Sequence, residues 1–437
     1  MKLNKWTLGL AAVGVVSLAS AARADEKMNQ VQTLVSGTTL SGSVDVAAVW
    51  RPGTDNNAAS SYYQSYYGSY YGYYGYGNRI PMYSFAKNDG FYLNAIDIAL
   101  DKPLDESPWA AGYHVELMAG PDAVPGNAFT ATYDGDSYLV TQSGAPVSIR
   151  QAYIALRTPV GNSAIDWKVG VWDSPLGYES SSDALNPNYT RSYGYSSEPT
   201  TFTGILGTFK VNDMITLQAG VADNGNGINN MRVSYESQKA YMGTFALTAP
   251  DSFGWAKGAT FNLGIIHSVA SSYWGDNTKD WLYAGATVPT PLTALKVGAT
   301  FDYMVDHDGY NYGPNNRNLD DSSWIVGLYA NYQINDKASF NLRGEYVHDD
   351  GEGPYAYNTY STYYGSLRVA NAAEVTATLQ YNLWANVLSR VEFRWDHVEH
   401  GNAFGVNSYN GEGYYYDYGY PNKANDFMLA LNLIYQF

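Results

Sequence analysis

The sequence contains no cysteine, carries few charges, and has no long apolar run after its first two dozen residues. Without cysteine, the chain cannot form disulfides, zinc–thiolate sites, a thiol nucleophile or a lipid anchor on cysteine. A spanning helix needs about 20 consecutive apolar residues, so the body of the chain is not a bundle of transmembrane helices. Charged residues make up only 15% and hydrophobic residues 45% of the 437 positions, which argues against a disordered chain.

The charge balance is acidic, because 41 Asp and Glu residues outnumber 25 Lys and Arg residues and give a net charge of −16. Such a chain repels nucleic-acid phosphates, so we expect no nucleic-acid partner. Tyrosine (42) and glycine (43) are abundant, which favours strands and turns over helices. The length fits either two or three ordinary domains or a single barrel.

The first 24 residues have the pattern of a cleavable secretory signal peptide. Lys2 and Lys5 precede an apolar stretch at residues 8–19, and residues 22–24 (Ala-Arg-Ala) supply the small residues that a signal peptidase reads. The apolar stretch is too short for a membrane anchor. We expect a mature protein that begins at Asp25 and has a charge of −19, since the removed segment holds three basic residues and no acid.

The rest of the chain alternates between apolar and polar residues. Near its C-terminus, Phe427, Leu429 and Leu431 share one face of a strand, and Met428 and Asn432 share the other. Alternation with a period of two indicates a strand between two different environments. We place sixteen strands near residues 39–50, 91–101, 109–120, 147–157, 163–172, 201–211, 214–222, 233–249, 257–268, 280–290, 293–305, 322–334, 337–348, 372–382, 386–397 and 425–437.

These strands predict an all-β fold, a transmembrane antiparallel β-barrel of about 16 strands with short periplasmic turns and long extracellular loops. A soluble sandwich would also alternate, but the apolar faces often begin or end with Trp or Tyr, as aromatic girdles do. Closure leaves no strand edge in contact with hydrocarbon. We assign residues 25–38 to a short periplasmic segment and 39–437 to the barrel. The long connections lie near 51–90, 121–146, 173–200, 223–232, 269–279, 306–321, 349–371 and 398–424.

Several stretches resemble one family. Residues 102–123 (KPLDESPWAAGYHVELMAGPDA), 149–162 (IRQAYIALRTPVGN), 167–180 (WKVGVWDSPLGYES) and 186–204 (NPNYTRSYGYSSEPTTFTG) are similar to the β-barrel porins of Gram-negative bacteria, the OmpL-like group. The terminal Phe437 resembles the signal read by the barrel assembly machinery of the outer membrane. The resemblance implies a diffusion channel for small hydrophilic solutes, surrounded by outer-membrane lipid and lipopolysaccharide. A homotrimer is one assembly that such a barrel can form.

A barrel of sixteen strands leaves a water-filled lumen lined by its polar faces. The charged residues that we expect to line this pore are Asp45, Glu116, Asp166, Lys168, Lys296, Asp302, Arg343, Glu345, Glu374, Arg390, Glu392, Arg394 and Asp396. The loop at 173–200 holds a position from which general porins fold a loop into the lumen. Its candidate constriction residues are Asp173, Glu179, Asp183, Arg191 and Glu198. Acids opposite a basic wall would sort solutes by charge, and the acidic total predicts a mild preference for cations.

Catalytic and metal-binding patterns are missing from the sequence. It has no G-x-S-x-G, H-E-x-x-H or phosphate-loop motif, and its six histidines lack ligand spacing. We therefore expect no enzyme, no catalytic residues, no metal and no cofactor. Residues 60–77 and 414–420 are rich in tyrosine, whose rings can stack on sugars. A surface adhesin or structural protein anchored by its barrel is thus the alternative function, and conductance in planar bilayers would separate the two.

Overall fold

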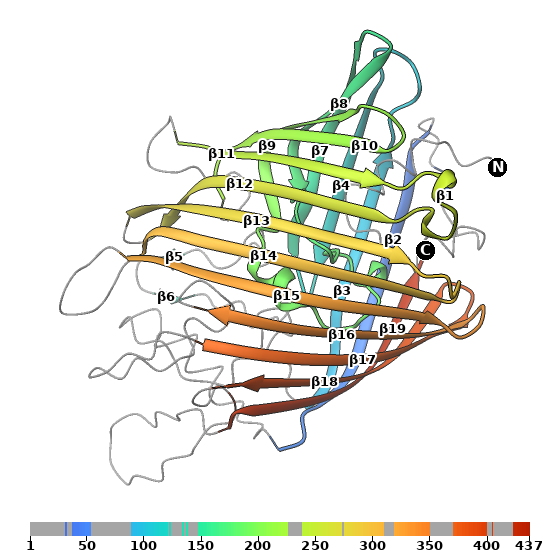
Figure 1. Cartoon of the computed structure of the whole chain (residues 1–437), viewed down its shortest axis with the longest axis vertical. Coiled ribbons are helices and arrows are strands. Elements are labelled where there is room, and N and C mark those ends of the chain that lie inside the picture. Colours follow the sequence, from blue (N-terminus) through green and yellow to red (C-terminus); the bar gives the residue numbers. More distant parts are fainter. Residues whose placement is uncertain are drawn as a thin grey trace.

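The protein, seen here in a computed structural model, is a closed antiparallel β-barrel (Figure 1). The structure describes residues 31–32, 37–53, 89–120, 122–123, 133–134, 137–138, 147–225, 238–272, 275–309, 319–349, 370–399, 404 and 423–437. Sixteen strands follow one another round the wall, and the pairing of β19 with β2 closes it. The barrel strands are β2 (Thr39–Trp50), β3 (Gly90–Lys102), β4 (Ala111–Ala119), β7 (Val147–Val160), β8 (Ser163–Asp173), β9 (Thr201–Lys210), β10 (Ile215–Ala222), β11 (Ala240–Thr248), β12 (Thr260–Ser272), β13 (Gly275–Pro289), β14 (Leu295–Gly309), β15 (Leu319–Gln333), β16 (Ala338–Asp349), β17 (Ala370–Trp384), β18 (Val387–Val398) and β19 (Asn425–Gln436).

The short elements lie beside or inside this wall. Strand β1 (Val31–Gln32) pairs with β2, and β5 (Tyr133–Asp134) pairs with β6 (Ser137–Tyr138) in a separate two-stranded sheet. The helical turns are η3 (Asp183–Leu185), α4 (Tyr193–Ser197) and η4 (Asp251–Ala256). None of the described helices is long and apolar enough to cross a membrane.

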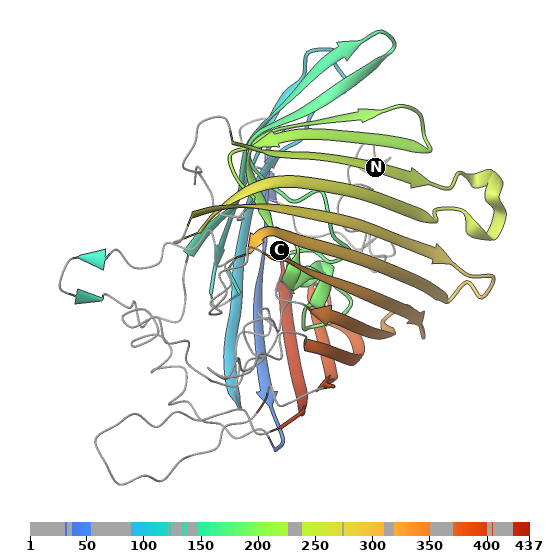
Figure 2. The same cartoon turned by 60° about the vertical axis from the view of Figure 1, so that its left-hand side comes forward.

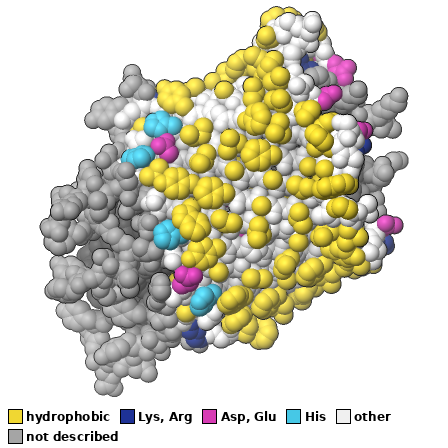
Figure 3. Space-filling model, viewed as in Figure 1, with side chains coloured by type: hydrophobic (Ala, Val, Ile, Leu, Met, Phe, Trp, Pro, Cys, Tyr) yellow, Lys and Arg dark blue, Asp and Glu magenta, His cyan; other side chains and the backbone are white. Residues whose placement is uncertain are grey.

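The burial pattern of β19 confirms the predicted alternation. Leu429 and Leu431 are exposed on the outside of the barrel, whereas Met428, Ala430 and Asn432 are buried. Apolar side chains also dominate the outer face in Figure 3. A band of this kind is stable only against hydrocarbon, because exposing it to water would cost about 25 cal/mol for each Å².

The described short connections gather at one end of the barrel, as Figure 2 shows. Two of them have residues with positive φ, Asn386 (65°) between β17 and β18 and Gly161 (59°) between β7 and β8. Asn and Gly adopt this region at little cost, so both turns stay tight. The chain end also lies here, where Phe437 and Gly42 exchange two backbone hydrogen bonds of 3.0 Å.

One predicted loop is wrong. Residues 269–279 are not a long connection, because β12 and β13 continue through this segment. Their register extends to the pair Ser272 and Gly275. The strands extend here beyond the apolar band, so the sequence does not alternate between apolar and polar residues. Alternation identifies a strand only where its two faces meet different environments.

The main hydrophobic cluster lies inside the barrel rather than between layers. Trp172 and Phe202 flank the connection between β8 and β9, and Leu176 and Tyr193 belong to that connection. They pack against inward residues of the wall such as Ile266. The cluster therefore attaches the connection between β8 and β9 to the inner wall.

Candidate functional site

The connection between β8 and β9, residues 174–200, folds into the barrel, and we call it the inner loop. It contacts the inner wall on opposite sides. Tyr189 Oη donates to Asn94 Oδ1 on β3 (3.2 Å), and Trp281 Nε1 on β13 donates to Ser197 O (3.2 Å). The inner loop thus crosses the lumen, as its path behind β14 and β15 in Figure 1 illustrates.

The inner loop is shaped by its own polar side chains. Ser192 caps α4 by accepting a hydrogen bond from the Tyr195 amide (2.9 Å). Asn186 accepts from the Ser180 amide (2.8 Å) and donates to the Ser180 carbonyl (2.7 Å). Side-chain bonds of this kind replace the partners that regular structure would provide, so the loop holds a defined course without a long helix.

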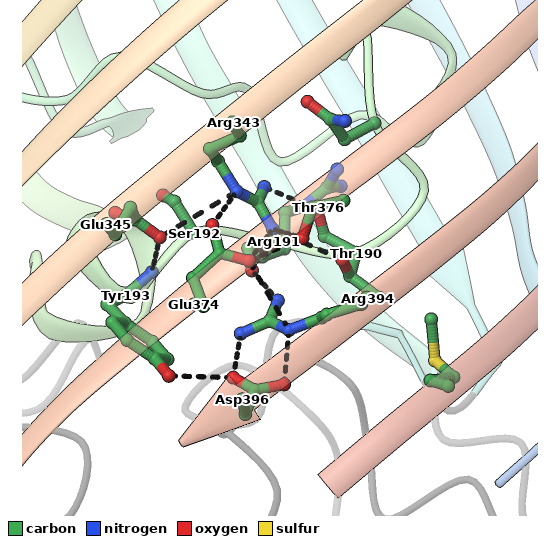
Figure 4. Close-up of polar contacts among 12 residues, drawn as sticks. Thr190, Arg191, Ser192, Tyr193, Arg343, Glu345, Glu374, Thr376, Arg394 and Asp396 are labelled. Carbon is green, nitrogen blue, oxygen red and sulfur yellow. Dashed lines mark hydrogen bonds and ion pairs between the residues drawn. The ribbon is translucent and has the colours of Figure 1, made fainter. Parts of the chain in front are cut away.

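Arg343 on β16 is fully buried at the centre of the contact between wall and loop (Figure 4). Its Nε donates to Glu374 Oε1 on β17, and its Nη1 donates to Glu179 Oε1 of the inner loop, both at 2.7 Å. Nη1 also donates to the Thr190 carbonyl (2.8 Å), and Nη2 to the Arg191 carbonyl (3.1 Å). One guanidinium therefore joins the wall to two parts of the loop.

Arg394 on β18 forms a second junction nearby (Figure 4). It donates through Nε and Nη2 to both oxygens of Asp396 at 2.8 Å, and through Nη1 to the Arg191 carbonyl at 2.6 Å. Tyr193 of α4 donates its hydroxyl to Asp396 (2.7 Å) and its amide to Glu345 on β16 (2.6 Å). Bidentate pairing fixes the guanidinium plane, which orients Arg394 toward the loop backbone.

Glu392 and Arg390, also on β18, hold the remaining part of the loop. Thr190 donates to Glu392 Oε1 through its amide (2.8 Å) and its hydroxyl (2.7 Å). Arg390 Nη2 donates to the carbonyls of Asp183 (3.1 Å) and Asn186. A wall acid thus binds loop donors, and a wall base binds loop acceptors.

Arg343 and Arg394 lie in direct contact with carboxylates beneath the inner loop, whereas Arg390 contacts neutral amide and backbone oxygens. They do not face the loop acids across open water, which was the arrangement drawn from the sequence. Within the loop itself, Arg191 pairs with Asp183. Because the charges of Arg343, Arg394 and Arg191 are paired and buried, they contribute little net charge to the lumen, and removing one member of a pair would leave the other uncompensated.

A further charged group lies on the wall formed by β4, β7 and β8. Arg150 Nη2 donates to Glu116 Oε2, and its Nη1 donates to Asp173 Oδ2, both at 2.7 Å. Lys168 lies 4.7 Å from the centre of the Tyr153 ring. Among the residues that the structure describes, Lys168 has no carboxylate oxygen within 4.0 Å.

Arg150 is the main residue that sequence reasoning missed. The pairing of β4 with β7 shifts register at Glu116 and Leu117. These two residues lie opposite Gln151 and Ile149, so no residue of β4 lies opposite Arg150 in the register. A bulge places two consecutive side chains on the same face, so Arg150 and Gln151 are both buried. The imperfect alternation of this strand was the signal for the bulge.

The other predicted residues are spread along the wall. Asp45 accepts hydrogen bonds from the amides of Asn94 and Asn432, both at 2.6 Å. Asp166 pairs with Arg157 at 2.6 Å, near the turn between β7 and β8. These two acids are far from the Arg343 contacts in the chain and interact with other partners.

Glu198 and Asp302 form a carboxyl pair where the inner loop ends. Burial and the neighbouring charge of Asp302 on β14, to which Glu198 is hydrogen-bonded, raise the pKa of Glu198 well above its usual range. A shared proton is the ordinary outcome for two carboxyl groups that are hydrogen-bonded to each other. Lys296 lies near the start of β14 and is half-buried. No group of His, Asp or Glu suited to a metal ion is found within the described segments.

The chain matches the family model described as "Putative beta-barrel porin-2, OmpL-like" over residues 37–437. It belongs to this porin family. The predicted family is confirmed, and the protein is accordingly an outer-membrane porin of the Gram-negative type, with a channel as its function. Among curated proteins, no sequence matches this porin.

Solved structures share the fold at low sequence identity. The outer membrane channel DcaP of Acinetobacter baumannii has a TM-score of 0.55 at 13% identity, covering 93% of this porin and 99% of that chain. An anion-selective porin from Comamonas acidovorans gives 0.54 at 11% identity, with 92% and 99% coverage. OmpF of Salmonella typhi, in complex with daunomycin, gives 0.51 at 12% identity, with 93% and 100% coverage. These likenesses confirm the barrel and carry no assignment of solute.

Proposed function

We propose that this porin forms a water-filled passage for small hydrophilic solutes and ions, and that the inner loop sets its narrowest section. The observation that carries the proposal is the attachment of the loop to opposite walls, through Tyr189 to β3 and through Ser197 to β13. A segment that crosses the lumen reduces the cross-section open to solutes. The selectivity of a pore is decided at such a constriction.

We also propose a mild cation preference. The arginines Arg343 and Arg394 each pair with wall acids, so their positive charges are largely offset. The described acid Glu392 is held by neutral donors instead. Acids compensated in this way retain a negative field that attracts cations. Two described cations oppose this field, Lys168 on the other wall and Arg390, which is held by neutral acceptors.

The setting of the barrel follows from the same proposal. We place the end that carries the described short turns in the periplasm and the opposite end outside the cell, and we propose cleavage of the signal peptide before Asp25. Phe437 would be read by the assembly machinery. Outer-membrane phospholipid and lipopolysaccharide would surround the barrel, and a homotrimer is the assembly to test by chemical cross-linking.

Planar-bilayer recording of the purified protein tests the proposal. A passive channel gives stepwise conductance at low voltage, with steps that scale with salt concentration. A barrel that serves as a surface adhesin would insert without producing such steps. The tyrosine-rich segments 60–77 and 414–420 that suggested an adhesin lie outside the described residues, so conductance decides between the two functions.

A further inference from the structure

Four histidines lie on the outer face of the barrel, at the end opposite the short turns. They occupy alternate strands, β12, β14, β16 and β18, and each continues the outward face that carries the apolar band below it. Figure 3 shows histidine and acidic side chains along the border of that band. Outward residues of the intervening strands complete a row of polar and aromatic side chains, which we call the rim row. Its members are His267, Asp280, His307, Trp324, His348, Asn371, His397 and Asn425.

The first part of the rim row consists of two imidazoles on one carboxylate. Nδ1 of His267 lies 2.6 Å from Asp280 Oδ1, and Nε2 of His307 lies 3.1 Å from Asp280 Oδ2. The side chains of His267 and His307 keep 55% and 38% of their surface exposed. Both imidazoles can therefore reach a group outside the barrel.

The second part combines histidine with aromatic and amide side chains. The ring of His348 stacks on Trp324 at 5.5 Å and lies 2.7 Å from Asn371 Oδ1 through Nδ1. The ring of His397 stacks in the same way on Trp395 at 5.7 Å. Tryptophan prefers the level of the lipid headgroups, so these contacts place the histidines at the membrane–water interface.

We propose that the rim row is a pH-dependent binding surface for the phosphate-bearing headgroups of the surrounding lipids. Imidazole is the side chain that gains a charge between about pH 5 and 8, and an imidazolium donates from both nitrogens. Phosphate oxygens accept such charge-assisted hydrogen bonds. The inference specifies how the lipids proposed above bind to the barrel. It rests on the proposed function, which places this end of the barrel on the outer side of the membrane.

The groups around the histidines determine how the row responds to pH. Asp280 contacts His267 and His307, and Tyr241 pairs with His267 across β11 and β12. Glu399 accepts hydrogen bonds from Asn371 (3.0 Å) and Tyr346 (3.3 Å) beside His348. While the imidazoles are neutral, the carboxylates of Asp280 and Glu399 make the rim row negative, and a negative row repels phosphate. Among the described side chains of this rim, four imidazolium charges outnumber the two carboxylates, so protonation reverses the sign of the row.

Lipid selectivity of the reconstituted full-length protein tests the proposal. The protein is placed in phosphatidylcholine vesicles with increasing fractions of brominated phosphatidylglycerol, and quenching of tryptophan fluorescence reports how strongly the anionic lipid binds. We expect the preference for phosphatidylglycerol to rise about fivefold between about pH 7.5 and about pH 5.5, which is the gain from roughly one cation near a headgroup. A wild-type preference that does not change with pH would overturn the proposal.

Matched variants assign the effect to the row. Replacing all four histidines by glutamine should abolish the rise, whereas His114→Gln, on the inner face of β4, should keep it. If the fourfold variant does not fold, Asp280→Asn with Glu399→Gln provides a second test and should raise the preference at neutral pH. An unchanged preference in that variant contradicts the proposal. Bilayer conductance of the same preparations is read separately, so failure of the channel and failure of lipid binding are distinguishable.

Discussion

Nη1 of Arg343 lies 2.7 Å from Oε1 of Glu179, although the two residues are 164 positions apart in the sequence. The pair joins the barrel wall to the inner loop, and both side chains are almost completely buried. The same guanidinium also binds Glu374 and two loop carbonyls. In this account, the wall arginines serve mainly to hold the inner loop and only secondarily to act on solutes.

Replacement of Arg343 by methionine should release this part of the loop. Methionine retains most of the volume but leaves Glu179 and Glu374 buried without their partner, which typically costs about 3–5 kcal/mol. We expect a lower urea midpoint for unfolding and larger, noisier single-channel conductance. The variant Arg343→Lys keeps the positive charge but loses the planar guanidinium with its several donors. Its urea midpoint and its conductance should lie between those of the wild-type protein and the methionine variant. A folded methionine variant with wild-type conductance would show that Arg343 does not control the loop.

Glu198 makes docking of the inner loop dependent on pH. Its pKa is raised in the folded protein by burial and by Asp302, so the protonated form is the one that docks well. The stabilising contribution is complete below the unfolded pKa of about 4.3 and is lost as the pH rises through the folded value. Conductance at constant salt should therefore increase with pH.

The variant Glu198→Gln imitates the protonated group and isolates this effect. Its conductance should change less between about pH 4 and about pH 9 than that of the wild-type protein. A variant that keeps the full wild-type pH profile would show that other groups control the docking.

Lys168 should weaken the preference for cations. It lies in the wall opposite Arg343, over the ring of Tyr153, and has no carboxylate within 4.0 Å in the described part of the chain. Lys168→Gln removes a positive charge and should shift the reversal potential in a KCl gradient toward greater cation selectivity. The shift should shrink as salt rises, since the Debye length falls from about 30 Å at 0.01 M to about 3 Å at 1 M. Anion selectivity of the wild-type protein at low salt would contradict the proposed preference.

A charge on the lipid-facing surface should destabilise the barrel. Leu431 lies in the middle of β19 with 54% of its surface exposed on the outer face. Leu431→Arg should cost about 2–4 kcal/mol in the free energy of unfolding into urea from lipid vesicles. The control Leu431→Ala should cost clearly less, because it buries no charge in hydrocarbon. Equal losses in the two variants would place this face outside the membrane.

The sequence predicted the barrel well because its strands separate two environments. Alternation along β19 is regular enough to locate both faces and the strand itself. It failed at β12 and β13, whose ends extend beyond the apolar band, and at Arg150, where a bulge changes the face that the side chain occupies. Irregular alternation marks a bulge, but it gives neither the pairing register nor the side chain that the bulge turns inward.

The contacts of the inner loop were beyond sequence reasoning for a different reason. The loop acids and the wall arginines were both identified, but the acids, Glu179 among them, were expected to face a basic wall across water and not to bond with it. Their direct contact depends on how residues 174–200 cross the barrel, and this course depends on local bonds such as those of Asn186 and Ser192. Tyr193 and Thr190 were missed because their roles need neighbours far along the chain.

Deletion of residues 180–188 from the inner loop tests the central claim most directly. Single-channel conductance of the deletion variant is compared with that of the wild-type protein at equal salt, after heat-modifiable mobility on gels has shown that both barrels are folded. We predict a clearly larger unit conductance, because the deleted segment includes the contacts of Asp183 and Asn186 with Arg390. An inserted, folded deletion variant with unchanged conductance would show that the inner loop does not set the narrowest section of the pore.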